Sequence, residues 1–92
     1  MSLLDRISDD MKTAMKEKSE QALSTLRMVK AALKNKQIDL MRELADEDVI
    51  TVLQTQSKQL AEALDGAIKA GRADLQEKAE AELAILKSYL PV

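Results

Sequence analysis

The sequence has no cysteine and no histidine among its 92 residues. Without cysteine there is no disulfide framework and no thiolate nucleophile, and without either residue the usual side-chain ligands of zinc are missing. No remaining side chain has an unperturbed pKa near neutrality, which removes the ordinary general base of a hydrolase. The sequence therefore predicts no catalytic residues, no metal site and no cofactor.

Aromatic residues are almost absent as well. Tyr89 is the only one, and there is no phenylalanine or tryptophan. We therefore expect a core built from aliphatic side chains and methionine. Sequence-tolerant binding of single-stranded nucleic acid generally uses aromatic side chains as stacking platforms, so this mode of binding is nearly excluded.

Long apolar runs are missing too. No stretch approaches the roughly 18 residues that a membrane span requires. The first residues, MSLLDRISDDMKTAMKEK, carry a charge every few positions, so they predict no signal peptide. We expect a cytoplasmic protein without a membrane partner. The net charge of −2 argues against nucleic-acid binding by overall charge but leaves room for a local basic patch.

Helix breakers are equally scarce, since the chain has only Gly66, Gly71 and Pro91. Apolar residues recur at spacings of three and four almost throughout, which is the period of an amphipathic helix. Short connections between these segments favour packing of each helix on its sequence neighbour. The sequence predicts an all-α, compact bundle of four helices, at about 3–18, 20–42, 46–70 and 74–90.

Several helix ends have recognisable signals. Ser2 is a plausible N-cap, the acidic run Asp46–Asp48 suits the positive end of a helix, and Gly71 suits a left-handed C-cap. Pro91 is expected to stop the fourth helix. Gly66 falls inside the third helix at a cost of up to about 1 kcal/mol relative to alanine, for which close packing is one explanation.

The apolar faces define the predicted core. Its members are, in chain order, Leu4, Ile7, Met11 and Met15; Ala22, Leu26, Val29, Leu33 and Leu40; Val49, Val52, Leu53, Leu60, Leu64 and Ile68; and Leu75, Ala79, Leu83, Leu86 and Leu90. Met11, Met15, Met28 and Met41 are interpreted as adaptable core filler, because the unbranched thioether fills irregular gaps.

One predicted helix carries charge of a single sign. The segment Gln21–Ile38 contains no acidic residue but four basic ones, which are Arg27, Lys30, Lys34 and Lys36. On a helical wheel the first three fall within roughly 60° of one another, while Lys36 points to a different side. We call Arg27, Lys30 and Lys34 the basic stripe.

The basic stripe has two interpretations. It borders the apolar face beside Leu23 and Met41, so the stems can cover apolar surface while the charges stay in water and pair with acids of neighbouring helices. Alternatively, the stripe and Lys58 contact RNA phosphates, which gives a weak and salt-dependent interaction without base reading. Arg27 then adds a bidentate phosphate contact that lysine cannot reproduce.

Three stretches in order, MSLLDRISDDMKTAMK, STLRMVKAALKNKQID and KAGRADLQEKAEAELAILKSYLP, resemble the N-terminal domain of YqeY-like proteins over almost the entire chain. That family is related to the tail of the GatB subunit of tRNA-dependent amidotransferase, a glutamine-dependent carbon–nitrogen ligase. In that enzyme the related tail is a tRNA-binding appendage and not the catalytic site. The resemblance implies a single helical domain over residues 1–92, without the second helical domain of the family.

The resemblance also implies a function. We expect a non-catalytic helical adaptor associated with amidotransferase machinery, with tRNA or amidotransferase subunits as partners. The predicted RNA-binding residues are Arg27, Lys30, Lys34 and Lys58. Catalysis of amide transfer by this chain alone would need a catalytic constellation, and none is visible.

The chain departs from the family pattern in ways that favour an alternative. Leu60 and Ala61 stand where basic residues are usual, and Ala67 or Ile68 stands where an aromatic is common. The alternative is a protein-interaction or self-assembly module with no nucleic-acid role, which forms a homo-oligomer. Its predicted contact residues are Leu60, Ala61 and Leu64.

Overall fold

The structure, a computed structural model, describes residues 2–91 and is all-helical there. Its elements are α1 (Leu3–Lys16), α2 (Glu20–Leu40), α3 (Asp46–Lys69) and α4 (Ala73–Lys87). The prediction of an all-α bundle of four helices is confirmed.

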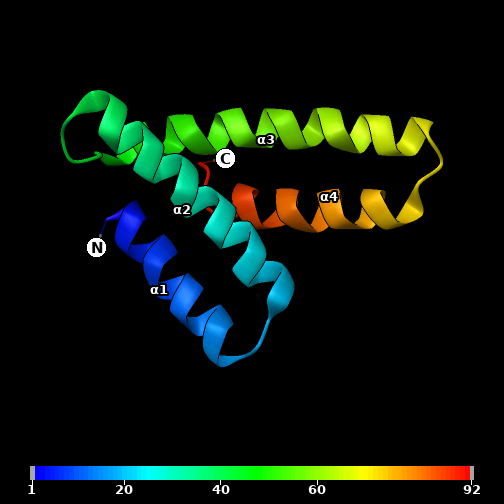
Figure 1. The fold of residues 1–92 in the computed structure, drawn as a ribbon, viewed down its shortest axis with the longest axis horizontal. Coiled ribbons are helices and arrows are strands. Elements are labelled where there is room, and N and C mark those ends of the chain that lie inside the picture. The colour runs from blue at the N-terminus through cyan, green and yellow to red at the C-terminus, as the bar shows by residue number, and fades with distance from the viewer. Residues whose placement is uncertain (1, 92) are drawn as a thin grey trace.

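The helices form two antiparallel hairpins (Figure 1). The pair α3 and α4 lies along the long axis of the molecule, whose extents are 42 × 29 × 25 Å, and α2 of the pair α1 and α2 crosses over it. The connection between α3 and α4 projects beyond the other hairpin. This arrangement leaves the outer face of α2 and the distal ends of α3 and α4 open to solvent.

Three predicted helix ends are confirmed by their hydrogen bonds. The Ser2 hydroxyl oxygen accepts a hydrogen bond from the backbone N–H of Asp5 at 3.1 Å. Helix α3 begins at Asp46, and the Asp48 carboxylate accepts from the backbone N–H of Ala45 at 2.8 Å. Gly71 has a φ of +68° and ends α3 in a Schellman motif, with the backbone N–H groups of residues 71 and 72 bonded to carbonyls of the last turn.

Helices α1 and α2 end two residues earlier than predicted, at Lys16 and Leu40. Lys18 and Met41 take left-handed backbone conformations, with φ values of 56° and 55°. The backbone N–H of Ser19 donates to the Ala14 carbonyl at 2.9 Å, which closes a Schellman motif without glycine. Such ends have no signal in the sequence, because lysine and methionine are ordinary helix formers.

Helix α4 also ends early, at Lys87 and not near residue 90. The chain continues in tight turns, where the backbone N–H of Tyr89 donates to the Leu86 carbonyl at 3.1 Å. This tightening turns the Tyr89 side chain inward, so that it is 7% exposed. The only aromatic residue therefore belongs to the core.

The core lies where the two hairpins meet. Its buried members are Ile7, Leu26, Val29, Leu33, Val49, Leu53, Leu86 and Tyr89. All but Tyr89 are aliphatic and lie on the predicted apolar faces.

Four predicted core residues are instead exposed, so those predictions are wrong. Ile68 and Leu75 lie at the distal ends of α3 and α4, which project beyond α1 and α2 and are not covered by them. Met15 lies in the last turns of α1, and Met41, 90% exposed, has left the helix as the C-cap of α2. Close packing does not explain Gly66 either, because a β-carbon built there meets no atom within 4 Å beyond the adjoining backbone of α3.

Candidate functional site

The basic stripe lies along the outer face of α2. Arg27 and Lys34 are exposed, and Lys30 is half-buried against α1. No carboxylate of residues 2–91 forms a salt bridge with any of the three. Pairing with acids of neighbouring helices, one part of the first interpretation, is therefore not found in the described part of the chain. The three charges remain available to an external anion.

Lys30 is oriented by a residue from the other helix of its hairpin. Its ammonium group donates a hydrogen bond to the Ser8 hydroxyl oxygen at 2.9 Å. An ammonium group has three donors, so two remain after this bond. Ser8 is 22 positions away in the sequence, which is why reasoning from α2 alone did not find it.

A groove opens beside Lys30 and Lys34. Its volume is about 440 Å³, within the range of small-ligand pockets. We call it the Leu33 groove, and its lining residues are Leu4, Lys30, Ala31, Leu33, Lys34, Gln37 and Leu44. The lining is aliphatic except for two amines and one amide, and it contains no carboxylate. Leu4 and Leu44 come from α1 and from the connection after α2, so only the fold brings them to the stripe.

The C-terminal end of α2 carries a second groove of about 490 Å³, which adjoins the first through Lys34 and Gln37. It also contains Arg42, whose guanidinium is bonded to the Asp48 carboxylate at 2.7 Å. This hydrogen bond, together with one from the Ala45 backbone, holds the pKa of Asp48 below its usual range. Arg42 is therefore already engaged in fixing the connection between α2 and α3.

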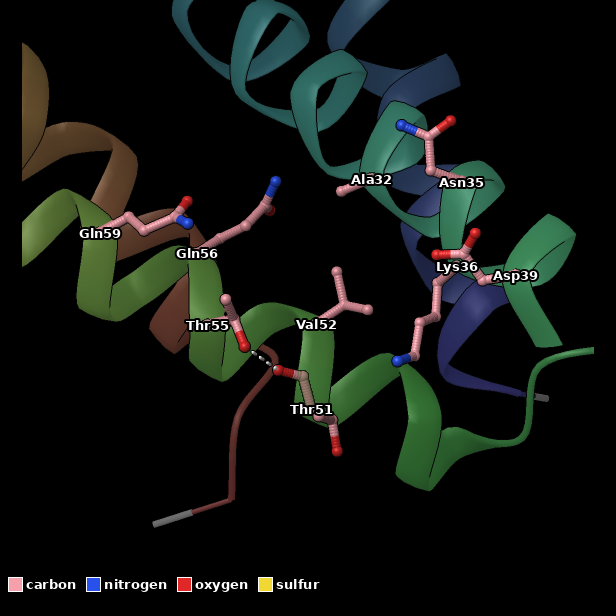
Figure 2. A pocket seen from close by; sticks show the side chains of 9 residues that line it. All are labelled: Ala32, Asn35, Lys36, Asp39, Thr51, Val52, Thr55, Gln56 and Gln59. Carbon is pink, nitrogen blue, oxygen red and sulfur yellow. Dashed lines mark hydrogen bonds between the residues drawn. The ribbon is translucent and has the colours of Figure 1, made fainter.

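The opposite side of α2 faces α3 across a polar groove of about 320 Å³ (Figure 2). Figure 2 shows Lys36 extending from α2 toward α3, so it points away from the basic stripe, as predicted. Gln56 reaches across from α3 and donates to the Met28 carbonyl at 3.5 Å. None of the predicted site residues lines this groove.

The structure separates the remaining predicted residues. Lys58 is exposed on α3, about 200° around that helix from Gln56, so it lies away from α2 and does not join the stripe. Leu60 packs against the core, Leu64 is half-buried, and Ala61 is exposed. The three therefore do not form one exposed apolar patch.

A hydrogen-bonded cluster joins α1 to the end of the chain. The Tyr89 hydroxyl donates to the Asp10 carboxylate at 2.5 Å, and the Arg6 guanidinium lies 4.8 Å from the centre of the Tyr89 ring. Burial, and then the hydrogen bond and charge of Asp10, raise the pKa of Tyr89 far above its ordinary value. This cluster closes the fold and lies away from the stripe.

Within residues 2–91, no set of three or more acidic side chains is arranged to hold a metal ion. Over the same residues, no helix is both long and apolar enough to cross a membrane.

The comparison with known families decides the family. A family model described as Yqey-like protein matches residues 4–92. The chain belongs to the YqeY-like family. The resemblance stated from sequence motifs is therefore confirmed at the level of the family, and the basic stripe and the Leu33 groove are features of a YqeY-like domain.

Three curated relatives are similar to this YqeY-like chain, and each is named "Altered inheritance of mitochondria protein 41, mitochondrial". The relative from Lachancea thermotolerans is 34% identical over 97% of this chain and 50% of its own length. The relative from Eremothecium gossypii is 32% identical over 95% of this chain and 48% of its own length. The relative from Pyrenophora tritici-repentis is 31% identical with the same coverage as the second. The chain spans about half the length of these relatives.

The names of these relatives correct one expectation. All three are described as mitochondrial proteins, which contradicts the predicted cytoplasmic location. The reasoning failed because charge spacing in the first residues argues only against a secretory signal. The names also mention no amidotransferase.

Proposed function

We propose that this YqeY-like domain is a non-catalytic helical adaptor that binds RNA, with tRNA as its class of partner, through the basic stripe of α2. The observation that carries the proposal is the set of three cations, Arg27, Lys30 and Lys34, which have no acidic partner within the described chain. Cations that form no intramolecular salt bridge keep their full electrostatic attraction for phosphates.

The geometry of the stripe supports contact with one backbone. Residues at positions i, i+3 and i+7 of a helix lie in a row, so the three charges follow one line along α2. Arg27 at one end has a guanidinium that can bind a phosphate with two parallel hydrogen bonds. The Lys30 ammonium is pre-oriented by Ser8, which lowers the entropy that a flexible side chain loses on binding.

The choice of tRNA rests on the family relationship to the GatB tail, and so does the link to amidotransferase machinery. The stripe itself specifies a polyanion and carries no base-reading information. A role as an adaptor is favoured over a role as an enzyme because the chain lacks histidine and cysteine.

Binding of the purified chain to unfractionated tRNA at increasing salt tests this function. Three phosphate contacts predict a slope of about −2.1 to −2.7 in log affinity against log salt, which is a loss of about 20- to 40-fold between roughly 50 and 200 mM. Replacing Arg27, Lys30 and Lys34 by glutamate is expected to abolish binding.

The control reverses three lysines away from the stripe, Lys16, Lys78 and Lys87, and is expected to bind far better than the stripe variant. Both variants change the net charge equally, so a difference between them reports position and not total charge. Equal loss in both would mean that the stripe is not the binding face.

A second candidate function is self-association through the projecting ends of α3 and α4. It is favoured by Ile68 and Leu75, which are 53% and 45% exposed there. Sedimentation of the chain with Ile68→Lys tests it, since this change is expected to shift an oligomer to monomer and leave tRNA binding intact. Leu60→Lys would be a poor test, because Leu60 packs against the core.

A further inference from the structure

The Leu33 groove has the composition of a site for a flat, mainly apolar group that carries polar edges. Its apolar lining includes buried Leu33 and half-buried Leu4 and Leu44, and exposed Gln37 supplies the only amide of the lining. Two of the three cations of the stripe, Lys30 and Lys34, line the same groove. A ligand in the groove would therefore lie within reach of the amines that we propose bind phosphates.

A nucleobase attached to a phosphate backbone matches this combination. In a duplex the bases are stacked and paired, so only their edges are presented and a concave aliphatic groove stays empty. An unpaired base can turn out of the strand and bury its face against apolar side chains. Phosphates on both sides of that base would then meet the stripe.

We propose that the Leu33 groove binds an unpaired base of the RNA whose phosphates contact the basic stripe. This inference rests on the proposed function and deepens it, because it makes single-stranded or looped RNA, and not duplex, the substrate class. The domain has no aromatic residue on this face, so aliphatic side chains take the place of a stacking platform.

Each polar group of the groove has a defined part. The Gln37 amide both donates and accepts, so it can pair with a base edge in the way that glutamine pairs with adenine. The Ser8 bond leaves two donors of the Lys30 ammonium for a phosphate beside the base. Ser8 is a positioning residue, because it acts only through Lys30.

The test compares a short unstructured RNA oligonucleotide with the same oligonucleotide annealed to its complement, by fluorescence anisotropy at low salt. The single strand is expected to bind about tenfold more tightly than the duplex, which corresponds to one buried and hydrogen-bonded base. Equal affinity for both forms, still lost in the stripe variant, would overturn this inference and leave the proposed function standing. Absence of binding to either form would overturn both.

Two variants locate the base. Gln37→Ala removes the edge contact, and Ala31→Leu fills the groove from its exposed rim; each is expected to reduce the preference for single strand while duplex binding is kept. Gln54→Ala, at an exposed glutamine of α3, is the matched control and keeps the preference. Circular dichroism of each variant checks that the helices form. A preference unchanged in both groove variants would overturn the inference.

Discussion

At the scale of the residue, the two glycines have opposite roles. Gly71 takes a φ of +68° at the end of α3, a conformation that costs an L-residue roughly 1–2 kcal/mol. Gly66 lies inside α3, and a β-carbon built on it meets no atom within 4 Å beyond the adjoining backbone of the helix. A glycine at this position increases the conformational entropy of the unfolded chain and makes no contact that stabilises the folded one.

Substitution of the two glycines by alanine is therefore expected to change stability in opposite directions. Gly66→Ala should raise the free energy of unfolding by about 0.5–1 kcal/mol, and Gly71→Ala should lower it by about 1 kcal/mol. Urea denaturation followed by circular dichroism measures both. A destabilised Gly66→Ala variant would show that this position has a packing partner after all.

Asp48 gives a residue-scale prediction for pH. Its folded-state pKa is lowered, chiefly by the hydrogen bond from Arg42, so its contribution to stability is present above the ordinary aspartate value of 3.8 and is lost as the pH falls through the folded-state value. The Asp48→Asn variant should melt at a lower temperature than the parent at neutral pH, and the difference should shrink below pH 3.8.

Arg42→Gln provides the check on the Asp48 prediction. It removes the hydrogen-bonding partner of the Asp48 carboxylate. Adding Asp48→Asn to this variant should therefore change the melting temperature at neutral pH less than it does in the parent protein. A difference between parent and Asp48→Asn that stays constant into acid would mean that the carboxylate charge is not what stabilises this connection.

At the scale of the element, the local signals in the sequence determine how much was predictable. Each helix shows a repeat of three and four, and the ends with a recognisable cap at Ser2, Asp46 and Gly71 were located. The ends at Lys18 and Met41 were each placed two residues too late, because a lysine and a methionine, and not a glycine, take the left-handed conformation there. Exposure of Ile68 was missed because periodicity does not tell how far a neighbouring helix extends.

The same distinction applies to the candidate site. The basic stripe was visible because its three residues lie on one helix with helical spacing. The Leu33 groove was not visible in the sequence, because Leu4 and Leu44 come from separate segments. Only the packing of the helices brings these two residues beside the stripe. Lys58 was predicted to bind RNA beside the stripe from its charge alone, and the structure has it on the side of α3 away from α2.

At the scale of the whole molecule, a cluster of contacts joins α1 to the segment after α4. Tyr89 and Asp10 are 79 positions apart, and their hydrogen bond fastens the segment after α4 to α1. Because the folded-state pKa of Tyr89 is raised, this contribution is present below the ordinary value of 10.0 and is lost as the pH rises through the folded-state value.

The titration of Tyr89 can be followed without ambiguity, since it is the only tyrosine. The absorbance of tyrosinate should stay absent in the folded protein well above pH 10.0 and appear near 10.0 in urea. Asp10→Asn removes the charge and should bring the folded-state pKa down toward the ordinary value. A folded-state midpoint at 10.0 in the parent protein would contradict the buried hydrogen bond.

The central claim is that the outer face of α2 is the binding face of this YqeY-like domain. The most direct measurement is the change in backbone amide NMR shifts of the isotope-labelled chain on addition of tRNA. The account predicts shifts concentrated at Arg27, Lys30, Lys34 and Gln37 and at Ser8 and Leu44. It predicts little change at Lys58, at Thr51 and Thr55 of the polar groove, or at the distal ends of α3 and α4. Shifts centred on the polar groove between α2 and α3, or on the projecting hairpin end, would contradict it.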